Sequence, residues 1–114
     1  MKKSTKIYLE DMLNAINEIE NSTKDITFEA FLNNYEKINS VAYDVLIIGE
    51  AANKLPNSFQ AENPQIPWRV LCDIRNKHIH EYQTVKPDKL WKMAKSSLPK
   101  IKDLLKGVLK ELPE

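Results

Sequence analysis

Residues 41–55 read VAYDVLIIGEAANKL, and this stretch decides between a helical fold and a sheet. Its apolar run from Tyr43 to Ile48 has the composition of a buried strand. The apolar positions of the whole stretch nevertheless recur at steps of three and four residues, at Val41, Val45, Ile48, Ala52 and Leu55. Because that step follows the turn of a helix and not the alternation of a strand, we expect a helix here.

The same helical period is found on the N-terminal side of this stretch. Ser4 or Thr5 is expected to cap a first helix, and the polar cluster Asn21-Ser22-Thr23 is expected to end it. A short helix is expected to follow over about residues 27–34.

The chain beyond residue 55 is also predicted to be helical. Residues 58–61 suit a single turn, and Pro67 suits the first turn of a helix that covers residues 68–81. A last helical region begins near Pro87. Pro99 lies inside this region and is expected to kink or split it near Ser97 or Leu98.

Four long helices joined by short links predict an all-α fold, an antiparallel up-and-down four-helix bundle with short extra helices. The 114 residues contain no repeat, no low-complexity tract and no interdomain linker. We therefore expect one domain over residues 1–114.

The composition excludes several classes of site. The two glycines, Gly49 and Gly107, are too far apart to form a phosphate-binding loop or a dinucleotide-binding turn. The single cysteine, Cys72, allows no intramolecular disulfide and is expected to be a small buried apolar residue. We expect no bound cofactor. Since no signal peptide and no membrane span is evident, a cytoplasmic protein is expected.

Charge is divided unevenly along the chain, although the net charge is only +1. Residues 1–63 contain six basic and ten acidic side chains, and residues 64–114 contain eleven basic and six acidic ones. Eight of the basic side chains are lysines between Lys86 and Lys110. Two interpretations stay open, a solvated helix face or a surface that attracts phosphate.

Residues 75–82 read RNKHIHEY and hold both histidines of the chain. At about 100° per residue, Arg75, Asn76, His80 and Tyr82 fall within an arc of about 160° on one side of a helix. His78 and His80 are two positions apart and fall about 200° apart on a helix, so no metal site is expected there.

These residue types suit the cleavage of a phosphodiester without a metal. Histidine transfers protons near neutral pH, so His80 is a candidate acid or base. Arg75 offers planar donors to a charged phosphate, and Asn76 and Tyr82 are candidates for orienting the scissile group or His80. Taken singly, each residue also has an ordinary structural interpretation, such as a surface charge or a packed ring.

The spacing of Arg75, His80 and Tyr82 is R-x4-H-x-Y. The surrounding stretches 8–13 (YLEDML), 47–52 (IIGEAA), 66–69 (IPWR) and 73–76 (DIRN), with Leu90-Trp91 and Leu98-Pro99, extend the likeness over nearly the whole chain. Through them the sequence resembles the HepT-like toxins, a branch of the HEPN superfamily. Glu81 stands where many relatives have glycine, and Tyr43-Asp44 stands where many have an arginine-asparagine pair.

The resemblance implies a helical HEPN bundle that forms a homodimer, with two motif helices at a shared cleft. It implies a metal-independent endoribonuclease that acts on RNA and is paired with an MntA-like minimal nucleotidyltransferase antitoxin. By position, Arg75, His80 and Tyr82 are the signature residues, and Asn76 is the polar residue after the arginine. Tyr82 would also be the acceptor of AMP from the antitoxin.

Three interpretations remain open from the residues alone. In the first, the chain is the enzyme. In the second, it is a non-catalytic subunit whose motif face binds a nucleotide or the partner nucleotidyltransferase. In the third, it is a helical interaction module in which the polar cluster only specifies the register of a dimer.

Overall fold

The computed structural model describes residues 4–80 and 86–113, and positions 76–80 are described as helix without their side chains. The described residues form helices and contain no strand, which confirms the all-α prediction. The long helices are α1 (Thr5–Thr23), α3 (Tyr35–Lys54), α5 (Trp68–His80) and α7 (Leu98–Glu111). The short ones are α2 (Phe28–Leu32), α4 (Asn57–Glu62), α6 (Pro87–Lys92) and the π-helical segment η1 (Met93–Ser97).

Side-chain caps explain where the first three helices begin. The Oγ of Ser4 accepts a hydrogen bond from the backbone N–H of Ile7, and the Oγ1 of Thr27 accepts one from Ala30. Asn34 accepts one from the N–H of Lys37 and so starts α3 at Tyr35, well before the apolar stripe that predicted this helix. Such caps satisfy N–H groups that have no partner within the helix.

The last helical region is interrupted before Pro99, near Ser97 and Leu98 as predicted, although the chain stays helical. Helices α6 and α7 run on through η1, where the N–H of Leu98 donates to the carbonyl of Met93, five residues earlier. Proline has no N–H to donate and its ring crowds the carbonyl four residues before it. The helix accommodates it with a wide π turn at Met93–Ser97, after which α7 begins at Leu98, the predicted position of the interruption.

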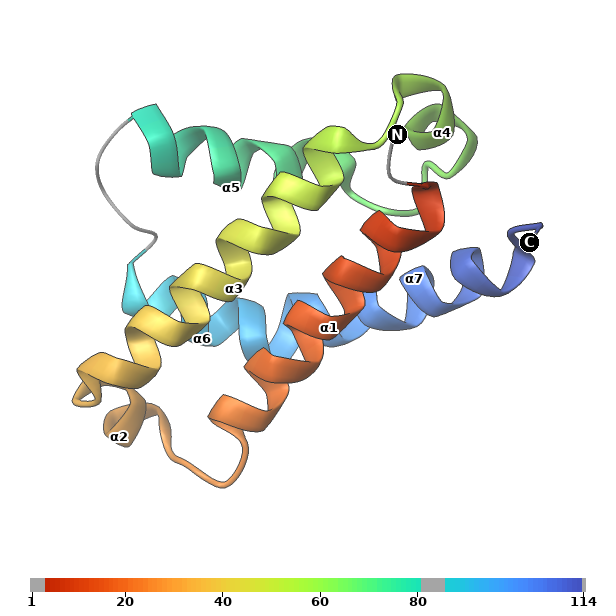
Figure 1. The fold of residues 1–114 in the computed structure, drawn as a ribbon. Helices are drawn as coiled ribbons and strands as arrows, with labels where there is room; N and C mark the ends of the chain where they lie inside the picture. The colour runs from red at the N-terminus through yellow and green to blue at the C-terminus, as the bar shows by residue number, and fades with distance from the viewer. Residues whose placement is uncertain (1–3, 81–85, 114) are drawn as a thin grey trace.

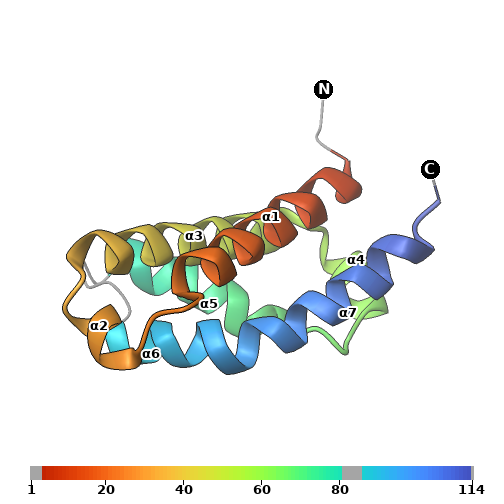
Figure 2. The same ribbon diagram turned by 90° about the horizontal axis from the view of Figure 1, so that it is seen from below.

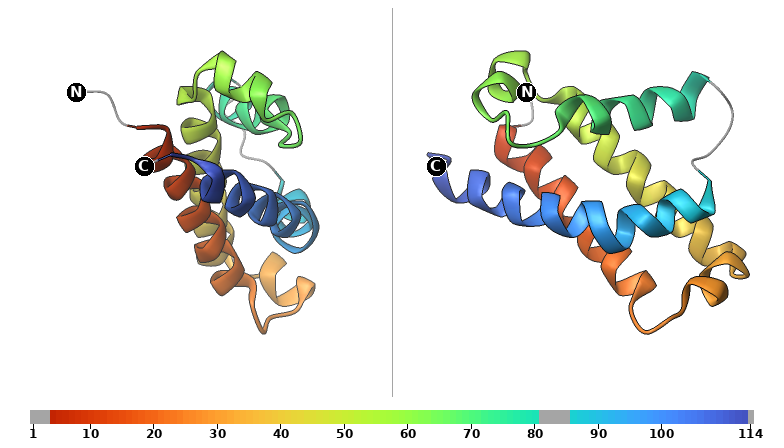
Figure 3. Two further views of the ribbon diagram at one scale, coloured as in Figure 1. Left: turned by 90° about the vertical axis from the view of Figure 1, so that its right-hand side faces the viewer. Right: turned by 180° about the vertical axis from the view of Figure 1, so that it is seen from behind.

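The helices form two layers, which Figure 2 shows from the side. Helices α1 and α3 lie antiparallel in one layer, and α5 and the α6–η1–α7 run cross behind them in the other (Figures 1 and 3). The strongest contacts join α1 to α3, α3 to α5 and α1 to α7. The core lies between the layers, where α1 contributes Leu9, Met12, Ile16 and Ile19 and α3 contributes Val41, Val45, Ile48 and Ala52.

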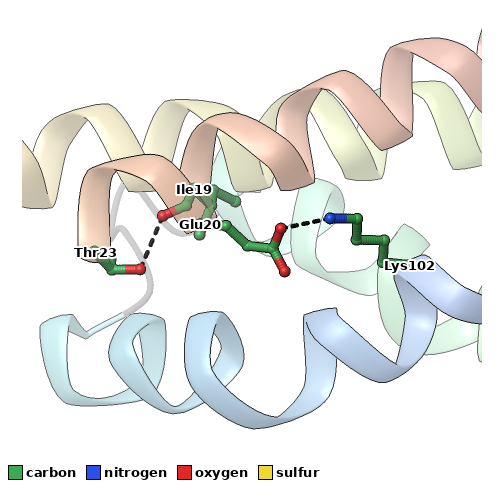
Figure 4. Close-up of polar contacts among 4 residues, drawn as sticks. All are labelled: Ile19, Glu20, Thr23 and Lys102. Atoms are coloured by element: carbon green, nitrogen blue, oxygen red, sulfur yellow. Dashed lines mark hydrogen bonds and ion pairs between the residues drawn. The ribbon is translucent and has the colours of Figure 1, made fainter. Parts of the chain in front are cut away.

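Two lysines of the last helical region fasten it to the end of α1. The Nζ of Lys102 lies 2.7 Å from Oε1 of Glu20, beside the buried hydroxyl of Thr23, which donates to the carbonyl of Ile19 (Figure 4). The Nζ of Lys95 donates to the carbonyl of Thr23 at 2.7 Å. These two lysines therefore hold the layers together, a role that neither interpretation of the lysine-rich segment included.

Candidate active site

Gly49 sets the distance between α3 and α5. A Cβ built on it would lie 2.8 Å from the Cβ of Arg75 and 2.9 Å from the carbonyl oxygen of Leu71. Both distances are shorter than real Cβ contacts allow, and the carbonyl belongs to the backbone of α5 and cannot rotate away. A glycine at position 49 therefore lets α5 pack directly on α3 at the residue where the R-x4-H-x-Y motif begins.

Glu50, the next residue of α3, binds the first residue of the motif. The Nε of Arg75 donates to Oε1 of Glu50 at 3.1 Å. The two side chains are 31% and 36% exposed, so the pair lies at the edge of the helix contact and is open to solvent. The carboxylate thus anchors the Arg75 guanidinium against α3 and limits the directions in which its donors point.

The position of Glu50 was not predicted from the sequence. The sequence did contain one signal for Glu50, because this residue directly follows Gly49, the glycine against which α5 packs. Glu50 also lines a hollow of about 290 Å³ between α1 and α3, with Tyr8, Asp11 and Lys54. Polar side chains from two helices therefore gather around Glu50, the residue that binds Arg75.

The other motif residues follow Arg75 along the chain. Asn76 and His80 belong to α5, whose helical backbone runs to His80 as the sequence predicts. Along a helix axis, Arg75 and His80 are separated by about 7.5 Å. Tyr82 and Glu81 lie outside the described residues. The roles assigned to Arg75, Asn76, His80 and Tyr82 stay predictions.

Cys72, one turn before Asn76, was predicted to be a small buried apolar residue and is half-buried in the structure. One side of Cys72 packs against the core, and the rest of the side chain stays exposed. Burial raises the pKa of its thiol, and the charge of Asp73 raises the pKa further. The thiol is therefore poorly suited to act as a nucleophile.

Asp44 is a buried carboxyl on α3, only 4% exposed. Burial raises its pKa from 3.8 to about 7, and a hydrogen bond with Glu18 and the charge of Glu18 act in the same direction. A protonated Asp44 can donate to the Glu18 carboxylate across the contact of α1 with α3.

Seven of the eight lysines between Lys86 and Lys110 are exposed, namely Lys86, Lys89, Lys92, Lys95, Lys100, Lys106 and Lys110. Of the eight, Lys95 and Lys102 are the lysines that fasten the layers. The remaining six fit both interpretations from the sequence, a solvated helix face and a surface that attracts phosphate.

Comparison with known proteins settles the family. A family model described as "Ribonuclease HepT-like" matches residues 12–108. The chain belongs to the HepT-like ribonuclease family.

Relatives in this family are similar over almost their entire length. A Thermococcus cleftensis protein named "Probable ribonuclease HepT" is 43% identical over 102 residues, which cover 90% of this chain and 93% of the relative. A Methanocaldococcus jannaschii protein named "Putative RNase MJ0125" is 35% identical over 113 residues, which cover 99% and 97%. No solved structure matches the chain significantly. Among the described residues of this HepT-like chain, no helix is long and apolar enough to cross a membrane.

Proposed function

We propose that this chain is a toxin endoribonuclease that cleaves RNA by proton transfer from its own side chains, without a metal. The observation that carries the proposal is the Arg75–Glu50 pair, which anchors an arginine on the same helix as His80 in a HepT-like ribonuclease. Family membership supports RNA as the substrate.

In the proposed mechanism, His80 takes the proton from a 2′-hydroxyl, whose oxygen then attacks the adjacent phosphorus. The bond from phosphorus to the 5′ oxygen breaks, and a protonated His80 supplies the proton to that leaving oxygen. Arg75 stabilises the extra negative charge on the phosphate. Asn76 and Tyr82 orient the scissile group or His80.

We also propose that the active form is a homodimer with a composite site. One copy offers a single Arg75 and a single His80, and proton removal and proton donation at opposite sides of a phosphate call for two groups. The second copy would supply the second histidine. This part of the proposal rests on the resemblance to HEPN dimers and on the acid–base requirement.

The proposed regulation is AMP transfer to Tyr82 by a cognate MntA-like minimal nucleotidyltransferase, which is the antitoxin. An adenylyl group adds bulk and negative charge close to the motif, and both oppose the entry of RNA.

The test is a cleavage assay on single-stranded RNA in the presence of EDTA, with the purified, unmodified protein. His80→Ala should abolish cleavage. His78→Ala, which removes the other histidine, should leave the cleavage rate unchanged. Arg75→Ala should reduce cleavage by about a hundredfold or more, while Arg69→Ala, which removes an exposed arginine of the same helix, should have little effect. Equal activity of the His80→Ala and His78→Ala proteins would refute the proposal.

A further inference from the structure

The four-helix bundle is open along one side. Helix α5 packs mainly on α3, and α7 packs mainly on α1, but α5 makes no comparable contact with the α6–η1–α7 run among the described residues. A groove of about 530 Å³ lies between them. Figure 3 shows this side of the bundle from behind, with α5 above the α6–η1–α7 run.

The groove is mainly apolar. Its deepest residues belong to the core, and its walls are formed by Val70 and Ile74 of α5 and Met93 of η1. Val70 is 59% exposed, which leaves a branched aliphatic side chain open to water at the mouth of the groove. Covering this side chain would remove apolar surface from water.

The two rims carry different charges. Lys89 and Lys92 lie on the α6 rim, and both are exposed. Neither forms an ion pair or hydrogen bond with a residue in the described part of the chain. Asp73 lies on the α5 rim. A partner that fills the groove would therefore place negative charge toward α6 and not toward α5.

The groove and the motif arginine lie on different sides of α5. At about 100° per residue, Val70, Asp73 and Ile74 fall between about 160° and 260° from Arg75 around the helix axis. The groove can thus be occupied while the Arg75 side of the helix stays open.

We propose that this groove binds an amphipathic helical segment of a partner protein, with its apolar face on Val70, Ile74 and Met93 and its carboxylates beside Lys89 and Lys92. A groove of this volume accommodates a few side chains, as in other grooves that bind a helix. Single-stranded RNA fits less well, because none of the described side chains that line the groove is aromatic and available for stacking, and Asp73 repels phosphate. The proposal does not depend on ribonuclease activity.

In the experiment, the full chain carries labelled methyl groups and is titrated with two synthetic helical peptides, while the methyl signals are followed by NMR. Both have leucine at positions i, i+3, i+4 and i+7, and one has glutamate along a flank where the other has lysine. We expect the acidic peptide to bind more tightly and to shift the methyl signals of Val70, Ile74 and Met93. Val70→Glu should weaken binding by about tenfold or more, while Ile7→Glu, at an exposed apolar residue outside the groove, should not.

The charge of the rim is tested with Lys92→Glu, which should reverse the preference between the two peptides. Lys106→Glu, at an exposed lysine away from the groove, should leave it unchanged. The proposal is overturned if neither peptide binds, or if both bind equally. It is also overturned if an RNA oligonucleotide, and not the acidic peptide, shifts these methyl signals, or if Val70→Glu dissociates a dimer of the chain.

Discussion

Gly49 of α3 packs so tightly against Arg75 of α5 that a Cβ on Gly49 would lie 2.8 Å from the Cβ of Arg75. The neighbouring Glu50 accepts a hydrogen bond from the same arginine. Two consecutive residues of α3 therefore set both the distance of the motif helix and the direction of its arginine. A change at Gly49 acts on the backbone of α5, whereas a change at Glu50 acts on one side chain.

Gly49→Ala should destabilise the fold and disturb the motif helix. The added methyl group meets the backbone of α5, so the helices must separate, and we expect the free energy of unfolding to fall by about 1–3 kcal/mol. RNA cleavage should fall with it. Urea denaturation measures the first effect and the cleavage assay the second.

Gly107→Ala is the matched control, since a Cβ at position 107 meets nothing within 4 Å. Glycine inside a helix costs stability, so this change should raise the free energy of unfolding by about 0.5–1 kcal/mol. Similar effects of the two substitutions would show that close packing at Gly49 does not govern stability.

Glu50→Ala should lower RNA cleavage more than it lowers stability. A partly exposed ion pair contributes at most about 1 kcal/mol to folding, but without the carboxylate the Arg75 guanidinium is no longer held in one direction. We expect kcat to fall by about tenfold with little change in Tm. Glu50→Gln keeps an oxygen acceptor for Nε and should restore part of kcat. An unchanged kcat in Glu50→Ala would remove Glu50 from the positioning of Arg75.

Asp44 should make stability depend on pH in the neutral range. Its pKa is raised from 3.8 to about 7 in the folded chain, so the folded state holds this proton more tightly than the unfolded state does. The stabilisation is complete below pH 4 and is lost as pH rises to 7, at up to about 1.4 kcal/mol per pH unit. Urea denaturation between pH 5 and pH 8 should show this loss.

Asp44→Asn removes the titration and keeps a polar side chain of nearly the same size at this position. The substituted protein should therefore gain stability relative to the parent as pH rises toward 8. The comparison of the two unfolding curves isolates Asp44, since every other group titrates in both proteins. Parallel dependence on pH in the two proteins would contradict the raised pKa.

Tyr82 should be the residue that receives AMP. After incubation with the cognate nucleotidyltransferase and ATP, the intact mass should increase by one or more AMP units, and RNA cleavage should fall. Tyr82→Phe should show no mass increase, whereas Tyr43→Phe, which removes an exposed tyrosine of α3, should be modified like the parent. Modification of the Tyr82→Phe protein would assign the acceptor to another residue.

Much of the fold could be predicted because its signals are local. The steps of three and four residues in 41–55 predicted α3, and Ser4 and the cluster 21–23 predicted the ends of α1. The place of the interruption before Pro99 was predicted, but its form as a π turn was not, because such a turn depends on hydrogen bonds spread over the preceding residues and not on the proline alone.

The candidate site was predictable only in its sequential part. The motif spacing pointed to Arg75, Asn76, His80 and Tyr82, since these residues lie within eight consecutive positions of the sequence. Glu50 could not be found in this way, because it is 25 residues from Arg75 and lies on another helix.

The sequence by itself determined the all-α class, the ends of most helices and the family, because periodicity, caps and motif spacing are properties of neighbouring residues. Only the tertiary structure decided that Gly49 lets α5 pack closely on α3, that Glu50 anchors Arg75, and that the bundle stays open between α5 and α6. These features arise where helices cross, and a crossing depends on the shapes of two packed surfaces that are remote in the chain.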